Sequence, residues 1–154
     1  MSVKILVSAV PLVVAAVFAH GESLSGPHPC ISVGATSVQI ADMPGQAALH
    51  VSFTDDPALA TVRVQIAETA EGADFAMVDD GGNSEGGACA ANTTTRLVAI
   101  SAGAAGNAPV IYLSAEGPAD YRIFVRSKAF TAREAAALVV GAGDGHHRLT
   151  AASL

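Results

Sequence analysis

Hydrophobic and polar residues alternate along most of the chain after residue 30. The alternation is clearest where Val62, Val64 and Ile66 enclose Arg63 and Gln65. A period of two is typical of a strand with one buried and one solvated face. Between turns rich in Gly, Pro, Asn and Asp, the same pattern predicts about seven short strands, within residues 30–42, 47–55, 58–69, 73–80, 93–102, 108–117 and 120–127.

Two local features interrupt this pattern. In residues 30–42 the alternation slips near Thr36, which predicts a β-bulge or a bend between two short strands. Near the C-terminus, Thr131 and Glu134 have the spacing of a capping box, and helix-favouring alanines follow them. We therefore expect a short helix over residues 132–139, ended by Gly141 or Gly143.

Regularly spaced short strands indicate an all-β fold. The prediction is an immunoglobulin-like β-sandwich of about seven strands with one short C-terminal helix, formed as a single domain by residues 30–154. No internal repeat and no linker that would divide this domain is apparent in the sequence.

The N-terminus has the organisation of a signal peptide. Lys4 supplies a positive charge, residues 5–19 are mainly apolar, and small residues occupy the positions before a cut after Ala19. The apolar run is shorter than the roughly 20 residues of a membrane-spanning helix, and no later segment is long enough. We expect residues 1–19 to be removed, residues 20–29 to form an extended lead-in, and the protein to be periplasmic or extracellular.

Charge and cysteine content indicate which partners and which covalent links to expect. The chain carries 8 basic and 14 acidic residues and no basic cluster, so nucleic acid is not an expected partner. Its two cysteines, Cys30 and Cys89, form an even pair in an exported chain and predict a disulfide bond. The alternative interpretation is that both bind a soft metal.

His20 would become the first residue after cleavage. Its α-amine and imidazole could then chelate one Cu(II) ion, with His28, His50, His146 or His147 as a further ligand. This arrangement resembles the histidine brace of lytic polysaccharide monooxygenases and of some periplasmic copper-carrying β-sandwiches. The resemblance implies copper binding, whereas the absence of Trp disfavours the flat aromatic surface of a monooxygenase.

Two other motifs suggest chemistry. Residues 82–86 match G-x-S-x-G, so Ser84 could serve as a nucleophile, with Asp120 or Asp144 and then His146 or His147 following in hydrolase order. The residues after this motif favour a strand over the helix that the motif requires. The carboxylate pairs at 55–56 and 79–80 could bind Ca²⁺, but adjacent acids between strands more often lie in solvated turns.

No catalytic set follows from these motifs, and sandwiches commonly serve as recognition scaffolds. The leading interpretation is an exported, non-enzymatic domain that binds a protein or surface partner or belongs to the cell envelope. The alternatives are a periplasmic copper-binding protein that uses His20 and a small serine hydrolase that uses Ser84.

Overall fold

The computed structural model describes residues 29–78, 93–128 and 131–143, which contain eight strands, two short 3₁₀ helices and one α-helix. The 3₁₀ helices are η1 (Pro44–Gln46) and η2 (Ala70–Gly72). The other elements are β1 (Cys30–Val33), β2 (Thr36–Ile40), β3 (Leu49–Phe53), β4 (Val62–Ile66), β5 (Phe75–Val78), β6 (Arg96–Ser101), β7 (Val110–Ser114), β8 (Tyr121–Arg126) and α1 (Ala132–Ala142).

All eight strands belong to one sheet, in the order β1-β2-β6-β3-β7-β4-β8-β5. Only β1 and β2 form an antiparallel pair, through a turn that Gly34 makes with a φ of 59°. Every other neighbouring pair is parallel. The β-rich class and the C-terminal helix are confirmed, but this sheet differs from the expected immunoglobulin-like sandwich, which consists of two facing antiparallel sheets.

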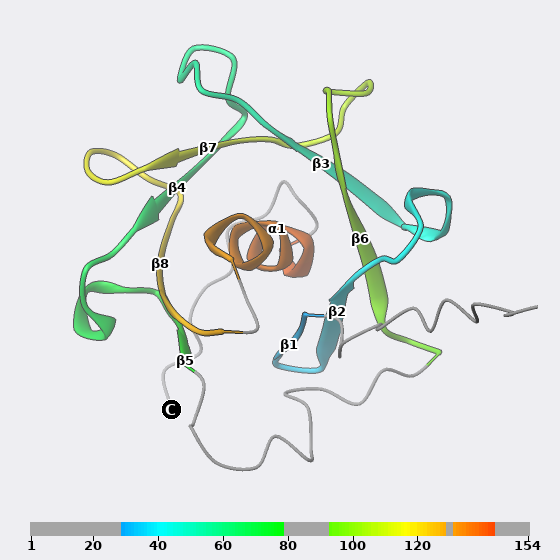
Figure 1. Ribbon diagram of the computed structural model, residues 1–154, viewed down its shortest axis with the longest axis horizontal. Helices are drawn as coiled ribbons and strands as arrows, with labels where there is room; N and C mark the ends of the chain where they lie inside the picture. The colour runs from blue at the N-terminus through cyan, green and yellow to red at the C-terminus, as the bar shows by residue number, and fades with distance from the viewer. Residues whose placement is uncertain (1–28, 79–92, 129–130, 144–154) are drawn as a thin grey trace, which may run out of the picture.

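The sheet curls around α1 because its strands are staggered (Figure 1). Ile40 at the end of β2 and Leu49 at the start of β3 both pair with Val98 of β6. In the same way, Phe53 and Val62 both pair with Ile111 of β7. Each strand therefore begins where the previous one ends, and the chain needs no long return crossover of the usual parallel kind.

The chain winds around the helix twice. Strands β2 to β5 form the first winding, and β6, β7 and β8 then lie between them. Corners 41–48, 54–61 and 67–74 of the first winding each have eight residues. The buried residues Val38, Val51 and Val64 consequently recur every 13 residues.

This 13-residue period is an internal repeat, so the prediction that the chain has no repeat was wrong. Residues 38–41 and 64–67 even carry the same letters, VQIA, 26 positions apart. Between them, the stretch that begins at Val51 has a different sequence. The repeat is therefore seen mainly in the positions of buried residues and the spacing of strands. The physical reason is the path length around the helix: each strand and corner together span a similar distance, so the next inward-facing residue lies the same number of positions along the chain.

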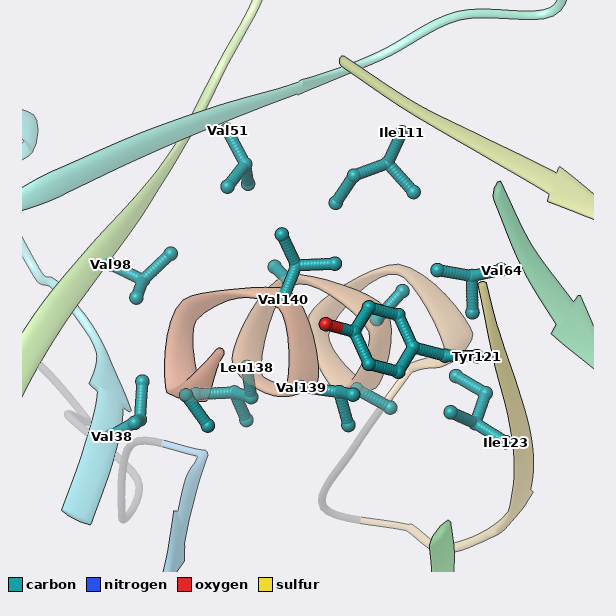
Figure 2. Close-up of a cluster of buried hydrophobic side chains, with 14 of the residues drawn as sticks. Val38, Val51, Val64, Val98, Ile111, Tyr121, Ile123, Leu138, Val139 and Val140 are labelled. Atoms are coloured by element: carbon teal, nitrogen blue, oxygen red, sulfur yellow. The ribbon is translucent and has the colours of Figure 1, made fainter. Parts of the chain in front are cut away.

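Helix α1 forms the centre of the core. Its residues from Ala135 to Ala142 are all buried, as expected for a helix that is apolar on every side. Figure 2 shows aliphatic side chains from the surrounding strands pointing toward it, among them Val51, Val98 and Ile111. The capping box is confirmed: the Glu134 N–H donates to Thr131 Oγ1, and Glu134 Oε2 accepts the Thr131 N–H at 2.8 Å.

At the start of several strands, a side-chain oxygen accepts a hydrogen bond from the backbone of the neighbouring strand. The Asp74 carboxylate accepts the backbone N–H of Arg122 at 2.7 Å, and the Asp120 carboxylate accepts that of Arg63 at 2.8 Å. Thr61 Oγ1 accepts the N–H of Val110 at 2.9 Å. Each such residue also donates its own N–H to the carbonyl of the same partner, so the strand starts are held by paired hydrogen bonds.

Candidate binding face on the outside of the sheet

The outer surface of β4, β7 and β8 presents the polar members of the alternating pattern. Successive residues of a strand point to opposite faces, and Val64, Ile111 and Ile123 point inward (Figure 2). Their neighbours on the opposite face form a set that we call the arginine face: Arg63, Gln65, Tyr112, Arg122, Phe124 and Arg126.

Register brings these residues together. Arg63 is level with Tyr112 on β7, and Gln65 is level with Arg122 on β8. In-register residues of neighbouring strands lie about 4.8 Å apart, and two residues along a strand add about 6.6 Å. The Cα atoms of Arg63 and Arg122 are therefore about 8 Å apart, and Arg126 lies about 13 Å beyond Arg122 along β8.

Hydrogen bonds hold the long polar side chains over the sheet. The Arg122 Nε–H donates to Gln65 Oε1 at 3.2 Å, and the Gln65 Nε2–H donates to the carbonyl of Ala115 at 3.1 Å. The Arg63 Nη2–H donates to the carbonyl of Pro57 at 3.3 Å. Each guanidinium therefore keeps most of its five N–H donors available.

Charge is segregated between the strands and their connections. The eight strands contain four charged residues, and all of them are arginines: Arg63, Arg96, Arg122 and Arg126. The acidic residues of the described part of the chain lie in the connections or, for Glu134, in the first turn of α1. Arg96 differs from the other three because its Nη1–H donates to the carbonyl of Gly141 at 2.9 Å, at the C-terminal end of the helix.

The carboxylates of Asp74 and Asp120 accept hydrogen bonds from the backbone of the arginine-bearing strands. Asp74 and Asp120 use a carboxylate oxygen to accept the N–H of Arg122 and of Arg63, and neither forms an ion pair with a guanidinium within the described residues. The arginine side chains on the outer side of β4 and β8 therefore have no carboxylate partner within the described residues. In an acidic protein, this concentrates positive charge on one surface.

A second polar group lies on the outer side of β3 and β6. His50 Nδ1 and Ser101 Oγ are 3.1 Å apart, and this contact is partly buried. Ser52, two residues after His50, is 2% exposed, and its hydroxyl has no hydrogen-bond partner within the described residues. Within the described residues His50 forms no hydrogen bond with a carboxylate, so its contact with Ser101 is an interstrand hydrogen bond.

The predicted copper ligands are not brought together by the described residues. His50 lies in β3, whereas His20 and His28 lie outside those residues, so the Cu(II) site stays a prediction. Among residues 29–78, 93–128 and 131–143, no three His, Cys, Asp or Glu side chains are placed to hold a metal. Cys30 begins β1 and is buried, and Cys89 lies outside the described residues, so their disulfide also stays a prediction.

The residues of the hydrolase-like motif and of the carboxylate pairs lie partly inside and partly outside the described residues. Ser84, Asp144, His146 and His147 lie outside the described residues, and Asp120 serves the backbone of β4 as described above. Of the carboxylate pairs, 79–80 also lies outside them.

The pair at 55–56 lies in the corner between β3 and β4. The Asp56 Oδ1 atom accepts the N–H of Ala58 at 2.9 Å, which is the geometry of an Asx turn. At this corner the structure supports the interpretation of the adjacent acids as turn residues.

The arginine face was not predicted from the sequence. The signal was present, since arginine is the only charged residue type within the strands and the acids fall between them. What the sequence lacked was strand order: Arg63 and Arg122 are separated by 59 positions and meet only because β8 inserts beside β4.

Comparisons with known proteins identify no relative. No protein-family model, curated protein or solved structure matches the chain. Within the described part of the chain, no helix has both the length and the apolar character needed to cross a membrane.

Proposed function

We propose that this protein is an exported, non-enzymatic binding domain that recognises a partner outside the cytoplasm with the outer face of its sheet. The arginine face is the observation that carries the proposal. Arginine and tyrosine are enriched in binding surfaces because they combine hydrogen-bond donors with large contact areas. Here they stand on a sheet whose inner face is packed against α1, which fixes their spacing before a partner arrives.

Export is supported by the N-terminal pattern of residues 1–19. A disulfide between Cys30 and Cys89 agrees with an oxidising compartment, and Cys30 stands at the first residue of β1. Such a bond would join the first strand to the connection between β5 and β6.

The test has two readouts. The full chain is expressed in a bacterium, and intact-mass analysis of the fraction outside the cytoplasm is expected to give a protein that begins at His20 with two fewer hydrogens than its reduced form. The purified mature protein is then expected to sediment with envelope material from the source organism in a saturable manner. Retention of residues 1–19 within the cytoplasm would contradict export, and non-saturable or absent sedimentation would contradict binding.

A specificity control separates binding from catalysis. Labelling of the mature protein by a fluorophosphonate at Ser84 would contradict the non-enzymatic assignment. A tight one-to-one Cu(II) complex that is lost when one residue is added before His20 would instead favour copper handling.

A further inference from the structure

We propose that the arginine face binds an acidic polysaccharide whose carboxylate groups are separated by neutral sugar hydroxyls. This inference rests on the proposed function, because it names the partner class for the same surface. It follows from three features of the face: the number of free guanidinium donors, the rings between them, and the position of the acidic residues around them.

A carboxylate fits this donor set. A guanidinium offers parallel N–H groups that a carboxylate accepts in pairs. Arg63, Arg122 and Arg126 have no carboxylate partner within the described residues, so an incoming carboxylate displaces no existing ion pair. Their spacing of about 8 and about 13 Å along neighbouring strands suits separated anionic groups rather than one compact multivalent ion.

The aromatic residues supply the neutral part of the contact. Tyr112 stands beside Arg63, and Phe124 lies between Arg122 and Arg126 on the same face of β8. Both rings are partly exposed. They provide apolar area for sugar C–H groups, and the Tyr112 hydroxyl and the Gln65 amide supply hydrogen bonds to sugar hydroxyls.

The acidic connections limit how densely charged the partner can be. Asp55 and Asp56 precede β4, Glu68 and Glu71 follow it, and Glu116 lies in the connection from β7 to β8. A nucleic acid or another polymer with closely spaced charges would bring its additional anions near these carboxylates, at an electrostatic cost. A polysaccharide with isolated carboxylates can meet the arginines while neutral sugars pass the acidic corners.

The experiment measures binding of the mature protein by biolayer interferometry to immobilised hyaluronan, in which a neutral sugar separates successive carboxylate-bearing sugars, at low salt and in 0.5 M NaCl. Dextran is the uncharged control, and poly-glutamate is the acidic peptide control. We expect saturable binding to hyaluronan, at least tenfold weaker in 0.5 M NaCl because exposed charge pairs are screened. Binding to dextran is expected to be undetectable, and binding to poly-glutamate at least tenfold weaker.

The decisive variant is Arg63→Gln/Arg122→Gln, with Arg133→Gln/Arg148→Gln as the matched control, because it changes net charge by the same amount and leaves the arginine face intact. We expect the first to lose at least tenfold in affinity and the second to lose less than threefold. A melting curve of each variant establishes that it is folded. A Tyr112→Ala/Phe124→Ala variant is expected to weaken binding without changing its salt dependence.

The outcomes are distinguishable from those of the proposed function. Equal losses in the two charge variants, or equal or tighter binding to poly-glutamate, would overturn the polysaccharide assignment. Saturable envelope binding without hyaluronan binding would overturn this inference and leave the proposed function standing. Envelope binding that resists Arg63→Gln/Arg122→Gln would place the binding surface elsewhere on the protein.

Discussion

The two faces of one sheet are built under opposite constraints. On the inner face, Val51, Val64 and Ile111 are fully buried against a helix that is itself buried, so each side chain has a volume that its neighbours fix. On the outer face, Arg63 and Arg122 are exposed, and each makes a side-chain hydrogen bond at the surface. Inner residues therefore determine whether the protein folds, whereas outer residues are free to determine what it binds.

The largest effect is expected from Ile111→Ala. Ile111 is fully buried and pairs with both Phe53 and Val62, so its truncation leaves a cavity at a junction of three strands. Unfolding in urea is expected to show a loss of about 2–5 kcal/mol. The matched Ile111→Val variant removes one methylene and should lose only about 0.5–1.5 kcal/mol. Similar losses in the two variants would contradict the described packing.

The next largest loss of stability is expected at Gly141, where the helix closely approaches the sheet. A Cβ atom added at Gly141 would lie 2.4 Å from Val98 Cγ2 and 3.2 Å from Val38 Cγ1. Although alanine favours helices, Gly141→Ala is expected to destabilise the protein by about 1–3 kcal/mol through overpacking.

A double variant tests this contact directly. Val98→Ala makes room beside the helix, so adding it to Gly141→Ala should cost less than the sum of the two single changes. Additive losses in a thermodynamic cycle measured by urea unfolding would show that Gly141 and Val98 are not in contact.

The strand-start carboxylates connect the two faces and are expected to have a smaller effect. Asp120→Ala removes the acceptor for the Arg63 N–H and should cost about 1 kcal/mol in thermal or urea unfolding. Asp120→Asn keeps an oxygen at that position and should recover most of the loss. If both variants lose stability equally, the carboxylate charge rather than the hydrogen bond is responsible.

The smallest effect on stability is expected from the outer face. Arg63→Gln/Arg122→Gln should change the free energy of unfolding by no more than about 0.5 kcal/mol per substitution, as is usual for exposed side chains. The same double variant is predicted to lose polysaccharide binding, so folding and function separate on one sheet. A stability loss as large as that of Asp120→Ala would show that these arginines support the fold.

Local structure was largely predictable because it depends on neighbouring residues. Alternation placed strands such as β4 and β8, and the Thr131–Glu134 spacing identified the start of α1. The slip near Thr36 corresponds to the turn between β1 and β2. The helix extends beyond the predicted residue 139 to Ala142, because Gly141 lies inside the helix at a close contact with Val98 instead of ending it.

The sheet topology was not predictable from the same signals. One-sided burial is usual for antiparallel sheets, and parallel sheets are normally covered on both faces, so alternation favoured a sandwich. Here the parallel strands enclose a single helix and leave their outer face polar. The apolar residues of α1 are consistent with several packing arrangements, and only strand order reveals that this helix fills the space within the curled sheet.

The sequence by itself determined which residues of each strand face inward, where the chain turns, and where the helix begins, because these depend on side-chain period and local hydrogen bonds. Tertiary structure alone decided that β8 lies between β4 and β5, and thus that Arg63 and Arg122 share one surface. The physical reason is that strand pairing joins backbone groups that every residue carries. Side-chain pattern therefore selects the face of a strand but not its neighbour, and the choice of neighbour is fixed only when all strands pack around the helix together.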